Sequence, residues 1–330
     1  MDDMQTTYNS DQIAVSIICN VYNHERYIRD ALEGFIQQKT TFPYEIIVHD
    51  DASTDNSASI ILEYASKYPQ KIIARIQTEN QYSKGIHIGE TFIYPICKGK
   101  YIALCEGDDY WTASCKLQRQ YDALEKHHEI DMCAHSADII DALSEKKVGI
   151  ISPSSTERIL SLEEVIWGGG SFLATNSLFF RKEIVTEIPP FRKNLKIDYT
   201  VQINGALRGG IYFLPENMSV YRYKVPGSWT DRIMSNNVKI LETYDKIAEM
   251  LVLLDEYTSG KYSDLIQKTI KRHRFGFQCM VNNERKLLGS EYRDDRRALS
   301  WKGKILFYIK VISPRFGKWL QKVKYKMVGL

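Results

Sequence analysis

The sequence predicts an α/β fold with a mostly parallel central sheet, flanking helices and a helical C-terminal extension. Strand-like and helix-like segments alternate through roughly the first half of the chain, which is typical of parallel strands joined by right-handed crossovers. Two apolar runs, at residues 45–51 and 100–109, end in clusters of acidic side chains. Short apolar runs bounded by turn residues indicate buried strands of such a sheet.

The first half of the chain supplies the regular alternation. We expect strands at residues 14–20, 44–49, 71–76 and 101–105. We expect helices at residues 25–39, 56–68, 87–96 and 116–127. The first of these helices repeats its apolar residues at helical spacing, and Ser53 and Thr54 are candidate N-caps of the second.

After about residue 130 the pattern changes to shorter strands. We expect these at residues 132–134, 148–151, 175–180, 211–214 and 219–223. Ser161 and Glu164 form a capping box, which marks a helix start. Helices are clearest at residues 238–254 and 263–282. The sequence therefore predicts a flexible N-terminus (1–12), one α/β domain (13–228) and a helical C-terminal region with a basic tail (229–330).

Composition indicates a folded protein and gives no support for nucleic acid binding. Of the 330 residues, 44% are hydrophobic and 26% are charged, which is ordinary for soluble domains. The net charge of +3 is small, but it is unevenly distributed. Residues 301–330 carry eight basic and no acidic side chains, which leaves 36 basic and 41 acidic side chains in residues 1–300.

The six cysteines show no C-x-x-C spacing. Cys19 and Cys105 fall within expected buried strands, where a free thiol behaves as a small hydrophobe. The first 12 residues lack the basic and apolar regions of a signal peptide. No run approaches the roughly 18 apolar residues that span a bilayer. These features predict a reduced, cytoplasmic protein.

The two acidic clusters point to a ligand. Open α/β sheets bind ligands beyond the carboxyl ends of their strands, where both clusters are expected to lie. Carboxylates that gather in one crevice repel each other unless a cation or a hydrogen-bond donor balances them. A divalent metal ion with a polyhydroxylated, phosphate-bearing ligand accounts for this arrangement, which suggests a sugar nucleotide.

Three motifs carry a resemblance to a known family. They lie at residues 15–25 (Val-Ser-Ile-Ile-Cys-Asn-Val-Tyr-Asn-His-Glu), 50–55 (Asp-Asp-Ala-Ser-Thr-Asp) and 106–109 (Glu-Gly-Asp-Asp). In this order and spacing, followed by Tyr221-Arg222, the chain resembles the family two glycosyltransferases over roughly residues 13–228. The resemblance implies the Rossmann-like GT-A fold of nucleotide-diphospho-sugar transferases.

The resemblance also implies roles for particular acids. Asp51 matches the acid that accepts a hydrogen bond from the nucleotide base. Asp108 and Asp109 match the metal-binding motif, with Asp108 nearer the ribose and Asp109 on the metal ion. Asp198 matches the catalytic base. The alternatives are turn or helix capping for the first three and an ordinary loop acid for Asp198.

Further nucleotide contacts follow from the same resemblance. Asn20 and Tyr22 match the loop that packs around the base. Glu25 and Lys84 are candidate contacts, with plain surface charge as the alternative. Lys224 stands where many relatives have a histidine near the metal ion and the diphosphate. A lysine cannot ligate a hard cation, but its charge could pair with the diphosphate.

The implied enzyme is an inverting glycosyltransferase that depends on Mn²⁺ or Mg²⁺. It would move one sugar, with a UDP-sugar as the expected donor, to a glycan or lipid-linked acceptor in cell-surface polysaccharide synthesis. The Gln-x-x-Arg-Trp motif and membrane spans of processive relatives are absent from the sequence. The alternatives are a catalytically silent sugar-nucleotide-binding or scaffolding protein and a sugar nucleotidyltransferase.

The C-terminal tail suggests a further partner. Residues 301–330 interleave basic side chains with aromatic and aliphatic ones, as an interfacial helix on an anionic membrane would. Pro314 predicts two short helices rather than one. The hypothesis is peripheral attachment to the inner face of the cell membrane. One alternative is a helical pair that packs on the protein with a solvated basic face. Nucleic acid binding is a weaker alternative, because no groove-reading motif accompanies the charge.

Overall fold

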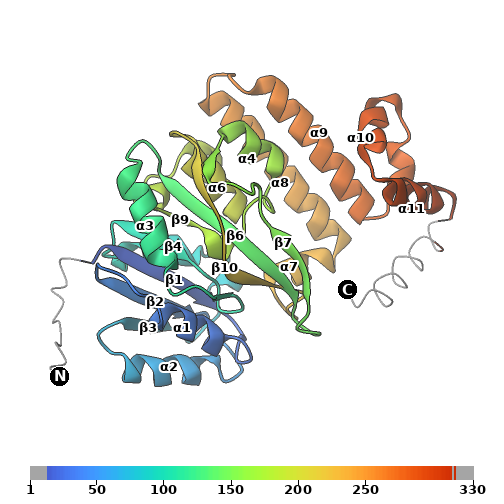
Figure 1. Ribbon diagram of the computed structural model, residues 1–330. Helices are drawn as coiled ribbons and strands as arrows, with labels where there is room; N and C mark the ends of the chain where they lie inside the picture. The colour runs from blue at the N-terminus through green and yellow to red at the C-terminus, as the bar shows by residue number, and fades with distance from the viewer. Residues whose placement is uncertain (1–12, 314–315, 317–330) are drawn as a thin grey trace. The chain divides into compact units, whose positions relative to one another are not determined.

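The computed structural model describes residues 13–313 and residue 316 (Figure 1). The chain divides into two compact units. Of the described residues, the first unit comprises 13–140, 149–189 and 196–223, and the second comprises 141–148, 190–195, 224–313 and 316. The main boundary thus falls between Tyr223 and Lys224, and two short internal segments join the second unit.

One mixed sheet forms the first unit, with the strand order β3-β2-β1-β4-β9-β6-β10-β5; β7 pairs with β6, and β8 pairs with β10. The strands are β1 (Val15–Val21), β2 (Tyr44–Asp50), β3 (Ile72–Ile76), β4 (Tyr101–Leu104), β5 (Tyr110–Trp111), β6 (Met132–Asp141), β7 (Lys147–Ile151), β8 (Arg158–Leu160), β9 (Phe179–Arg181) and β10 (Ile211–Tyr223). The first four strands pair in parallel, whereas the pairs β4–β9, β9–β6, β10–β5 and β10–β8 are antiparallel. The predicted fold class is confirmed.

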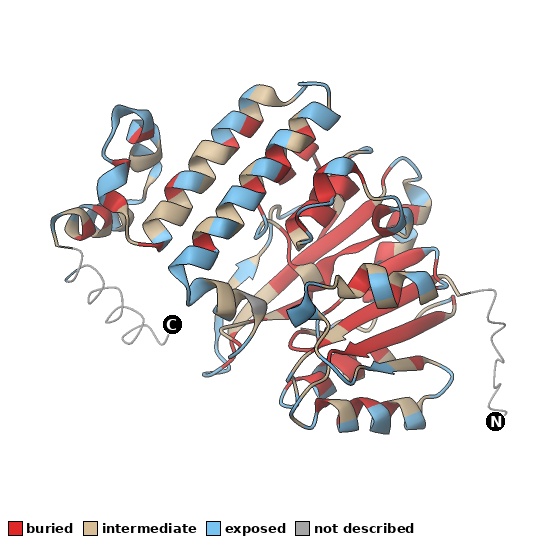
Figure 2. Cartoon of the chain, turned by 180° about the vertical axis from the view of Figure 1, so that it is seen from behind, coloured by how far each residue is buried: buried red, intermediate tan, exposed pale blue. Residues whose placement is uncertain are grey.

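The helices of the first unit cover this sheet. They are α1 (Ile28–Ile36), α2 (Ser57–Lys67), α3 (Lys116–Lys126), α4 (Leu162–Gly168), α5 (Glu183–Thr186) and α6 (Asp198–Ala206). Helix α1 buries Ile28, Leu32 and Phe35 at helical spacing against the strands. Strand β2 is buried along its whole length, as expected of a parallel strand with both faces covered. Figure 2 shows this as buried strands between helices with exposed outer faces.

Two local predictions about helices are wrong. Residues 87–96 form a π-helix, η3 (Gly89–Ile93), and a 3-10 turn, η4 (Tyr94–Ile96), rather than an α-helix, because a proline at position 95 cannot donate a backbone hydrogen bond. Ser53 and Thr54 do not cap α2, whose N-cap residue is Asn56. Ser53 instead donates through its backbone N–H and its hydroxyl to Asp50.

Two strand predictions also change. Residues 211–223 form one strand, β10, rather than two, and the strand continues through the proline at position 215. β8 pairs with residues 211–213 and β5 with residues 219–220, and β6 is a further neighbour of β10. Residues 175–180 do not form one strand. They begin with the 3-10 turn η5 (Thr175–Ser177) and continue as the short strand β9.

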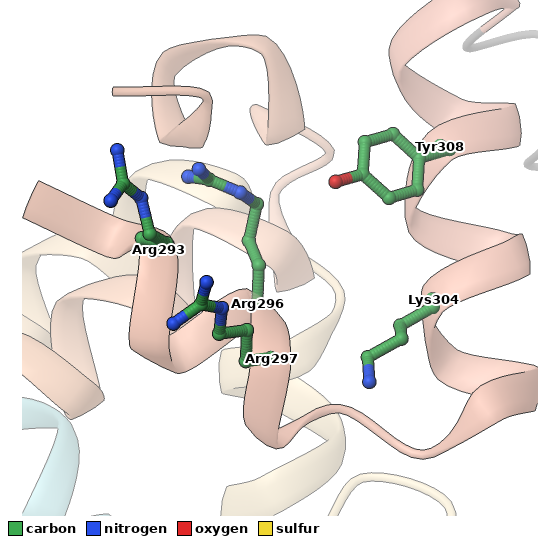
Figure 3. Close-up of a pocket in the computed structure, with 5 residues that line it drawn as sticks. All are labelled: Arg293, Arg296, Arg297, Lys304 and Tyr308. Atoms are coloured by element: carbon green, nitrogen blue, oxygen red, sulfur yellow. The ribbon is translucent and has the colours of Figure 1, made fainter. Parts of the chain in front are cut away.

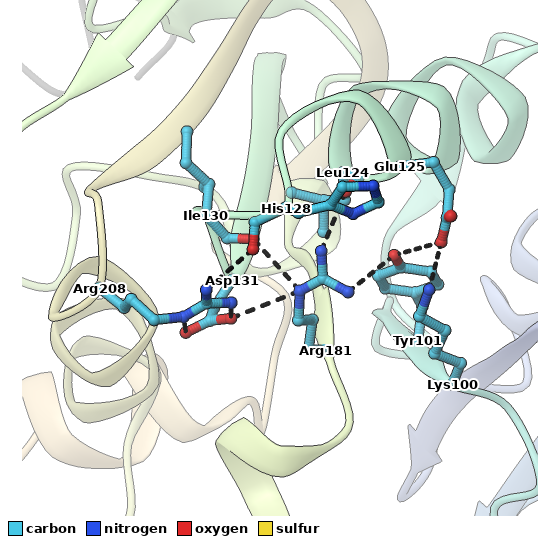
Figure 4. A network of polar contacts seen from close by, with 9 residues as sticks. All are labelled: Lys100, Tyr101, Leu124, Glu125, His128, Ile130, Asp131, Arg181 and Arg208. Carbon is cyan, nitrogen blue, oxygen red and sulfur yellow. Dashed lines mark hydrogen bonds and ion pairs between the residues drawn. The ribbon is translucent and has the colours of Figure 1, made fainter.

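A polar network fixes the start of β4 to its neighbours (Figure 4). The Arg181 guanidinium donates to the Tyr101 hydroxyl at 3.0 Å and to the Leu124 carbonyl oxygen at 3.0 Å. It also lies 3.4 Å from Asp131, which pairs with Arg208 as well. Because Tyr101 opens β4, this network lies at the opposite end of that strand from the acidic cluster, and we interpret it as structural.

The second unit is mainly helical. Its helices are α7 (Trp229–Met234), α8 (Asn237–Tyr257), α9 (Ser263–Met280), α10 (Arg293–Ala298) and α11 (Trp301–Ile312), with 3-10 turns η6 (Pro190–Arg192), η7 (Glu284–Leu287) and η8 (Ser290–Tyr292). The expected helices at 238–254 and 263–282 are confirmed. The Asn236 side chain caps α8 by accepting hydrogen bonds from two backbone N–H groups.

Helix α11, the first part of the basic tail, is anchored within this unit. Phe307 packs in a small buried cluster with Phe275, Leu287 and Tyr292, and Lys310 forms a buried ion pair with Glu284 at 3.0 Å. The helix ends at Ile312, and the second helix that was expected beyond Pro314 lies outside the described residues. Within the described chain, no helix is both long enough and apolar enough to cross a membrane.

Candidate active site

The strand ends bring the predicted acids to one edge of the sheet. Val21, the last residue of β1, stands opposite Asp50 of β2, and the Asp51 N–H donates to the Val21 carbonyl oxygen at 2.9 Å. The Gly107 N–H donates to the Asn20 carbonyl oxygen at 3.0 Å. Asn20, Asp51 and the acidic loop (residues 106–109) therefore meet at the carboxyl ends of β1, β2 and β4.

A glycine is required where the acidic loop crosses β1. A Cβ atom at Gly107 would lie 2.8 Å from Cγ2 of Val21 and 2.9 Å from Nδ1 of His24, which is closer than carbon atoms pack. The absence of a side chain at this position allows the loop to lie directly on the end of β1. It places Asp108, the next residue, beside His24.

Asp109 is almost completely buried, with an exposed fraction of 2%. Its Oδ1 accepts a hydrogen bond from the Arg222 backbone N–H at 2.8 Å, and its Oδ2 accepts one from Nδ2 of Asn176 at 3.0 Å. Burial and the neighbouring charge of Asp108 raise the pKa of Asp109 well above its ordinary value, although the Arg222 N–H opposes this rise. Two protein donors thus hold this carboxylate in place.

Asn176 is a site residue that the sequence analysis missed. It lies in η5, is fully buried, and also donates to the Val220 carbonyl oxygen at 2.9 Å. Its Oδ1 accepts from the Ser219 hydroxyl at 2.7 Å, and its backbone carbonyl oxygen accepts from Nε1 of Trp111 at 2.9 Å. All its polar side-chain atoms are therefore used, so Asn176 fixes Asp109 relative to β5 and β10. No recognisable motif marks an isolated asparagine of this kind.

Arg222 connects the acidic loop to α1. Its guanidinium donates to the Asp108 backbone carbonyl oxygen at 2.9 Å and pairs with Asp30. The same guanidinium lies over the rings of Tyr27 and Tyr110, at 5.0 and 4.4 Å from their centroids, where cation–π attraction adds to the contact. The Tyr-Arg pair seen in the sequence thus supports the loop that carries the aspartates.

The carboxylate of Asp108 is more accessible than that of Asp109. Its side chain is 12% exposed, and its Oδ2 lies 3.8 Å from Nε2 of His24. Within the described part of the chain, Oδ1 of Asn20 and Nδ1 of His24 are buried without a hydrogen-bond partner. The Asp108 carboxylate and the His24 imidazole thus lie near each other, and the Asn20 backbone meets the same loop through Gly107.

Carboxylate and carbonyl oxygens are the ligands that Mg²⁺ and Mn²⁺ favour. Across the described residues, no three His, Cys, Asp or Glu side chains are grouped to hold a metal ion by themselves. Asp108 and Asn20 therefore fit a site with few protein ligands, of the kind that is completed by phosphate oxygens and water.

Asp198 is the first residue of α6 and accepts a hydrogen bond from the Thr175 hydroxyl. Burial raises the pKa of Asp198, and the Thr175 hydroxyl opposes this rise. Glu106 is reachable by solvent, yet desolvation by the surrounding protein and the charges of Asp108 and Asp198 raise its pKa. Asp198 is therefore close enough to the acidic loop to interact with it electrostatically.

Thr175 and Asn176 connect the two sets of acids. These neighbouring residues of η5 contact Asp198 and Asp109, respectively. The structure thus gathers three of the predicted acids, Asp108, Asp109 and Asp198, around one loop and one short turn.

Asp51 lies at the same edge of the sheet but already has partners. Its two carboxylate oxygens accept the N–H groups of Gln81 and Tyr82, at 2.8 and 3.0 Å, where the 3-10 turn η2 (Tyr82–Lys84) begins. This is the turn-capping role that the sequence left open. Tyr22 is half-buried in the loop that follows β1.

Three further predicted contacts are engaged elsewhere. Glu25 is exposed and accepts hydrogen bonds from the backbone and side chain of Asn56, at 2.9 and 3.0 Å. Lys84 pairs with Glu79, which precedes its turn in the chain. In the second unit, Lys224 lies 3.1 Å from Asp141. In the structure, each of these three charged side chains therefore has a protein partner.

Comparison with known proteins identifies the family. A model described as "Glycosyl transferase family 2" matches residues 16–188, just over half of the chain. An uncharacterized protein of Mycobacterium tuberculosis is 38% identical over 224 residues, which is 66% of this chain and 62% of that protein. The UDP-Glc:alpha-D-GlcNAc-diphosphoundecaprenol beta-1,3-glucosyltransferase of Escherichia coli is 31% identical over 119 residues, or 36% of this chain and 44% of that enzyme.

Solved structures show the same fold. A mannosyltransferase from Pyrobaculum calidifontis, determined with GDP-Man and Mn²⁺, superimposes with a TM-score of 0.54 at 14% identity. The match covers 92% of this chain and 85% of that one, which supports the GT-A architecture. The M. tuberculosis relative is matched over less than two thirds of its length. On the match of the family model, the chain belongs to glycosyl transferase family 2.

Proposed function

We propose that the chain is an inverting, metal-dependent glycosyltransferase that moves a single sugar from a nucleotide-diphosphate sugar to an acceptor hydroxyl. The observation that carries this proposal is the convergence of Asp108, Asp109 and Asp198 at the carboxyl edge of the parallel strands. Such an edge is where open α/β sheets bind their ligands. Family membership supports the reaction class.

Asp108 and Asp109 would hold Mn²⁺ or Mg²⁺, with Oδ1 of Asn20 beside them. When bound, the cation would neutralise the charge that develops on the leaving diphosphate. The Mn²⁺ in the P. calidifontis structure supports this choice. The sequence predicts Asp109 on the metal ion and Asp108 nearer the ribose. Because Asp108 is the more open carboxylate, we propose that it too bonds the cation directly. Asp109, which is held by Arg222 and Asn176, fixes the geometry and retains lone pairs for the same ion.

Asp198 would act as the general base. It would take the proton of the acceptor hydroxyl as that oxygen attacks the anomeric carbon, while the bond from that carbon to the diphosphate oxygen breaks. Attack from the side opposite the leaving group inverts the configuration. Thr175 holds the Asp198 carboxylate, and a raised pKa suits a base that works near neutral pH.

The nucleotide would lie along Asn20, Tyr22 and Asp51, which line the same strand ends. We propose UDP as the carrier, as in the name of the E. coli relative. Glu25, Lys84 and Lys224 each already contact another protein group. The proposal therefore does not depend on these three residues.

The acceptor would be a glycan or a lipid-linked sugar in cell-surface polysaccharide synthesis. The name of the E. coli relative specifies a sugar on diphosphoundecaprenol, which supports a lipid-linked acceptor here. Such acceptors lie in a membrane, so an enzyme on the cytoplasmic side would have to reach its surface. Peripheral association with that surface is therefore part of the proposal.

Donor binding is the first test. A panel of nucleotide sugars is screened for thermal stabilisation of the protein, with and without Mn²⁺. We expect stabilisation by one donor that requires the cation and is lost in Asp108→Asn. The control is Asp122→Asn, the same change at an exposed position of α3, which should bind as the wild type does. Stabilisation by the donor that is unaffected by Mn²⁺ and by Asp108→Asn would contradict the metal assignment.

Turnover separates the alternatives. The selected donor is incubated with lipid-linked glycan acceptors, and release of the nucleoside diphosphate is followed. Release that depends on the acceptor supports a glycosyltransferase. Donor binding without any release would indicate a silent binding protein. Formation of pyrophosphate from a nucleoside triphosphate and a sugar phosphate would indicate a nucleotidyltransferase.

A further inference from the structure

The second unit contains a basic cavity that no part of the proposed reaction uses. Its volume is about 180 Å³, and it is lined by Arg293, Arg296, Arg297, Lys304 and Tyr308. Figure 3 shows the three arginines on α10, with the lysine and the tyrosine reaching toward them from α11. No acidic side chain is among these lining residues.

The acids of α10 do not cancel this positive charge. Asp294 is highly exposed and lies 3.9 Å from Arg297, a distance at which a solvated ion pair contributes little. Asp295 lies 3.9 Å from Lys271 of α9. Arg296 donates to the carbonyl oxygens of residues 287 and 289, so it is held in place and keeps its charge. Four cationic groups therefore face one cavity.

An apolar stripe runs along α11 beside this cavity. Trp301, Ile305, Tyr308 and Ile312 are spaced four, three and four residues apart, so they share one face of the helix. They are exposed by 67%, 52%, 47% and 78%, respectively. Phe307 of the same helix is buried in the small core cluster. The stripe is thus a second apolar face on a helix whose first apolar face is already packed.

Exposed apolar faces of this kind mark interaction sites. We infer that α10 and α11 together form a docking surface for an anionic lipid bilayer. The arginines and lysines would pair with headgroup phosphates. The tryptophan and tyrosine would lie at headgroup level, and the isoleucines would enter the acyl boundary.

The charge of the surface favours a bilayer over a second copy of the chain. Two copies that met through this face would bring four cationic groups against four others, which is repulsive unless anions intervene. Lys302 is also exposed, next to Trp301, and adds to the positive potential at the edge of the stripe. The inference concerns binding alone and does not depend on the donor or the acceptor of the proposed reaction.

Vesicle sedimentation tests this inference with the full chain. Vesicles of phosphatidylcholine alone are compared with vesicles that also contain phosphatidylglycerol. The charge variant is Arg293→Glu/Arg297→Glu/Lys304→Glu, and the apolar variant is Trp301→Ser/Ile305→Ser/Ile312→Ser. The matched control is Lys239→Glu/Lys246→Glu/Lys268→Glu, which makes the same number of charge reversals at exposed positions of α8 and α9. Circular dichroism checks that each variant is folded.

We expect the wild type and the control to bind phosphatidylglycerol vesicles and not phosphatidylcholine vesicles. A basic residue near an anionic surface contributes roughly fivefold in affinity. Loss of three such residues should weaken binding of the charge variant by at least about a hundredfold, because the new glutamates also repel the surface. The apolar variant should lose at least tenfold, because three inserted side chains are removed.

Three results would overturn the inference. In the first, both variants bind as the wild type does, which would assign any binding to residues beyond the described helices. In the second, sodium pyrophosphate stabilises the protein but no vesicle binds it, which would indicate a site for a soluble phosphate. In the third, the wild type is a dimer that the apolar variant converts to a monomer, without vesicle binding, which would assign the face to a second copy.

Discussion

Replacement of Asn176 by alanine would test how the acidic loop is held. The change removes the donor to Oδ2 of Asp109, the donor to the Val220 carbonyl oxygen and the acceptor of the Ser219 hydroxyl. All of these groups are buried, so water cannot readily replace the lost partner. The substitution should therefore reduce both stability and the fraction of Asp109 that is ionised.

The size of each effect follows from these contacts. A hydrogen bond to a charged group contributes about 1.5–3 kcal/mol, and each buried polar group left without a partner costs about 1–3 kcal/mol. The effects of neighbouring groups do not simply add, so we expect the free energy of unfolding to fall by about 3–6 kcal/mol. Loss of the bond to the charged form of Asp109 alone should raise the pKa of Asp109 by about 1–2 units.

Two measurements check this expectation. Urea unfolding gives the change in stability, and the pH dependence of kcat/KM for sugar transfer gives the change in ionisation. The acidic limb of that profile should move to higher pH by about 1–2 units. Asn176→Ser, which restores one hydroxyl donor, should lie between alanine and the wild type.

Asn204→Ala is the matched control. Asn204 is also buried and donates to the Ile184 carbonyl oxygen at 2.9 Å, but it contacts none of the acids. It should lose about 1–3 kcal/mol of stability without moving the acidic limb. If Asn176→Ala left the limb in place, or if the control moved it equally, the assigned role of Asn176 would be wrong.

Three further predictions follow. Burial lowers the pKa of Lys116 to about 7, so between pH 7 and 10 the unfolded chain holds a proton that the folded chain has released. In urea unfolding, the stability of the wild type should therefore rise with pH in this range by about 1.4 kcal/mol per pH unit relative to Lys116→Met. Equal pH dependence of the two proteins would refute this. Gly107→Ala should reduce stability by about 1–3 kcal/mol through overpacking and should bind the donor more weakly. The control is Gly276→Ala, where a Cβ meets nothing within 4 Å, and it should not be destabilised. An unaffected Gly107→Ala would contradict the close approach of the loop. Because the pKa of Asp109 is raised, its carboxyl group stays protonated to higher pH in the folded chain than in the unfolded chain, so stability should fall as pH rises above about 4 toward that raised pKa. Stabilisation by Mn²⁺ in thermal unfolding should be larger at pH 8 than at pH 5, because the cation needs the ionised carboxylate. A larger effect at pH 5 would count against a carboxylate site.

The sequence predicts most of the first four strands because their residues are buried on both faces. The continuous apolar runs of β1 and β2 leave little choice of structure. Prediction is weaker where single residues decide between close alternatives. A proline at position 95 breaks the helix expected at 87–96, whereas a proline at position 215 does not break β10, which runs through it from residue 211 to residue 223.

The candidate site likewise contains residues whose position could be predicted and contacts that could not. Asp108 and Asp109 follow a strand with a clear signature, so their position could be predicted. The contacts that hold them come from η5 and β10, which lie far away in the sequence. Periodicity carries no information about such pairings. The partners of Asp51 and Lys84 were likewise unpredictable, because they depend on the conformation of one turn.

The most direct test of the central claim is the rate of nucleoside diphosphate release by Asp198→Asn, measured at saturating donor and acceptor. The account predicts a rate about 10²–10⁴ times lower than that of the wild type, with unchanged affinity for the donor. Release at the wild-type rate, with donor bound equally well, would contradict it.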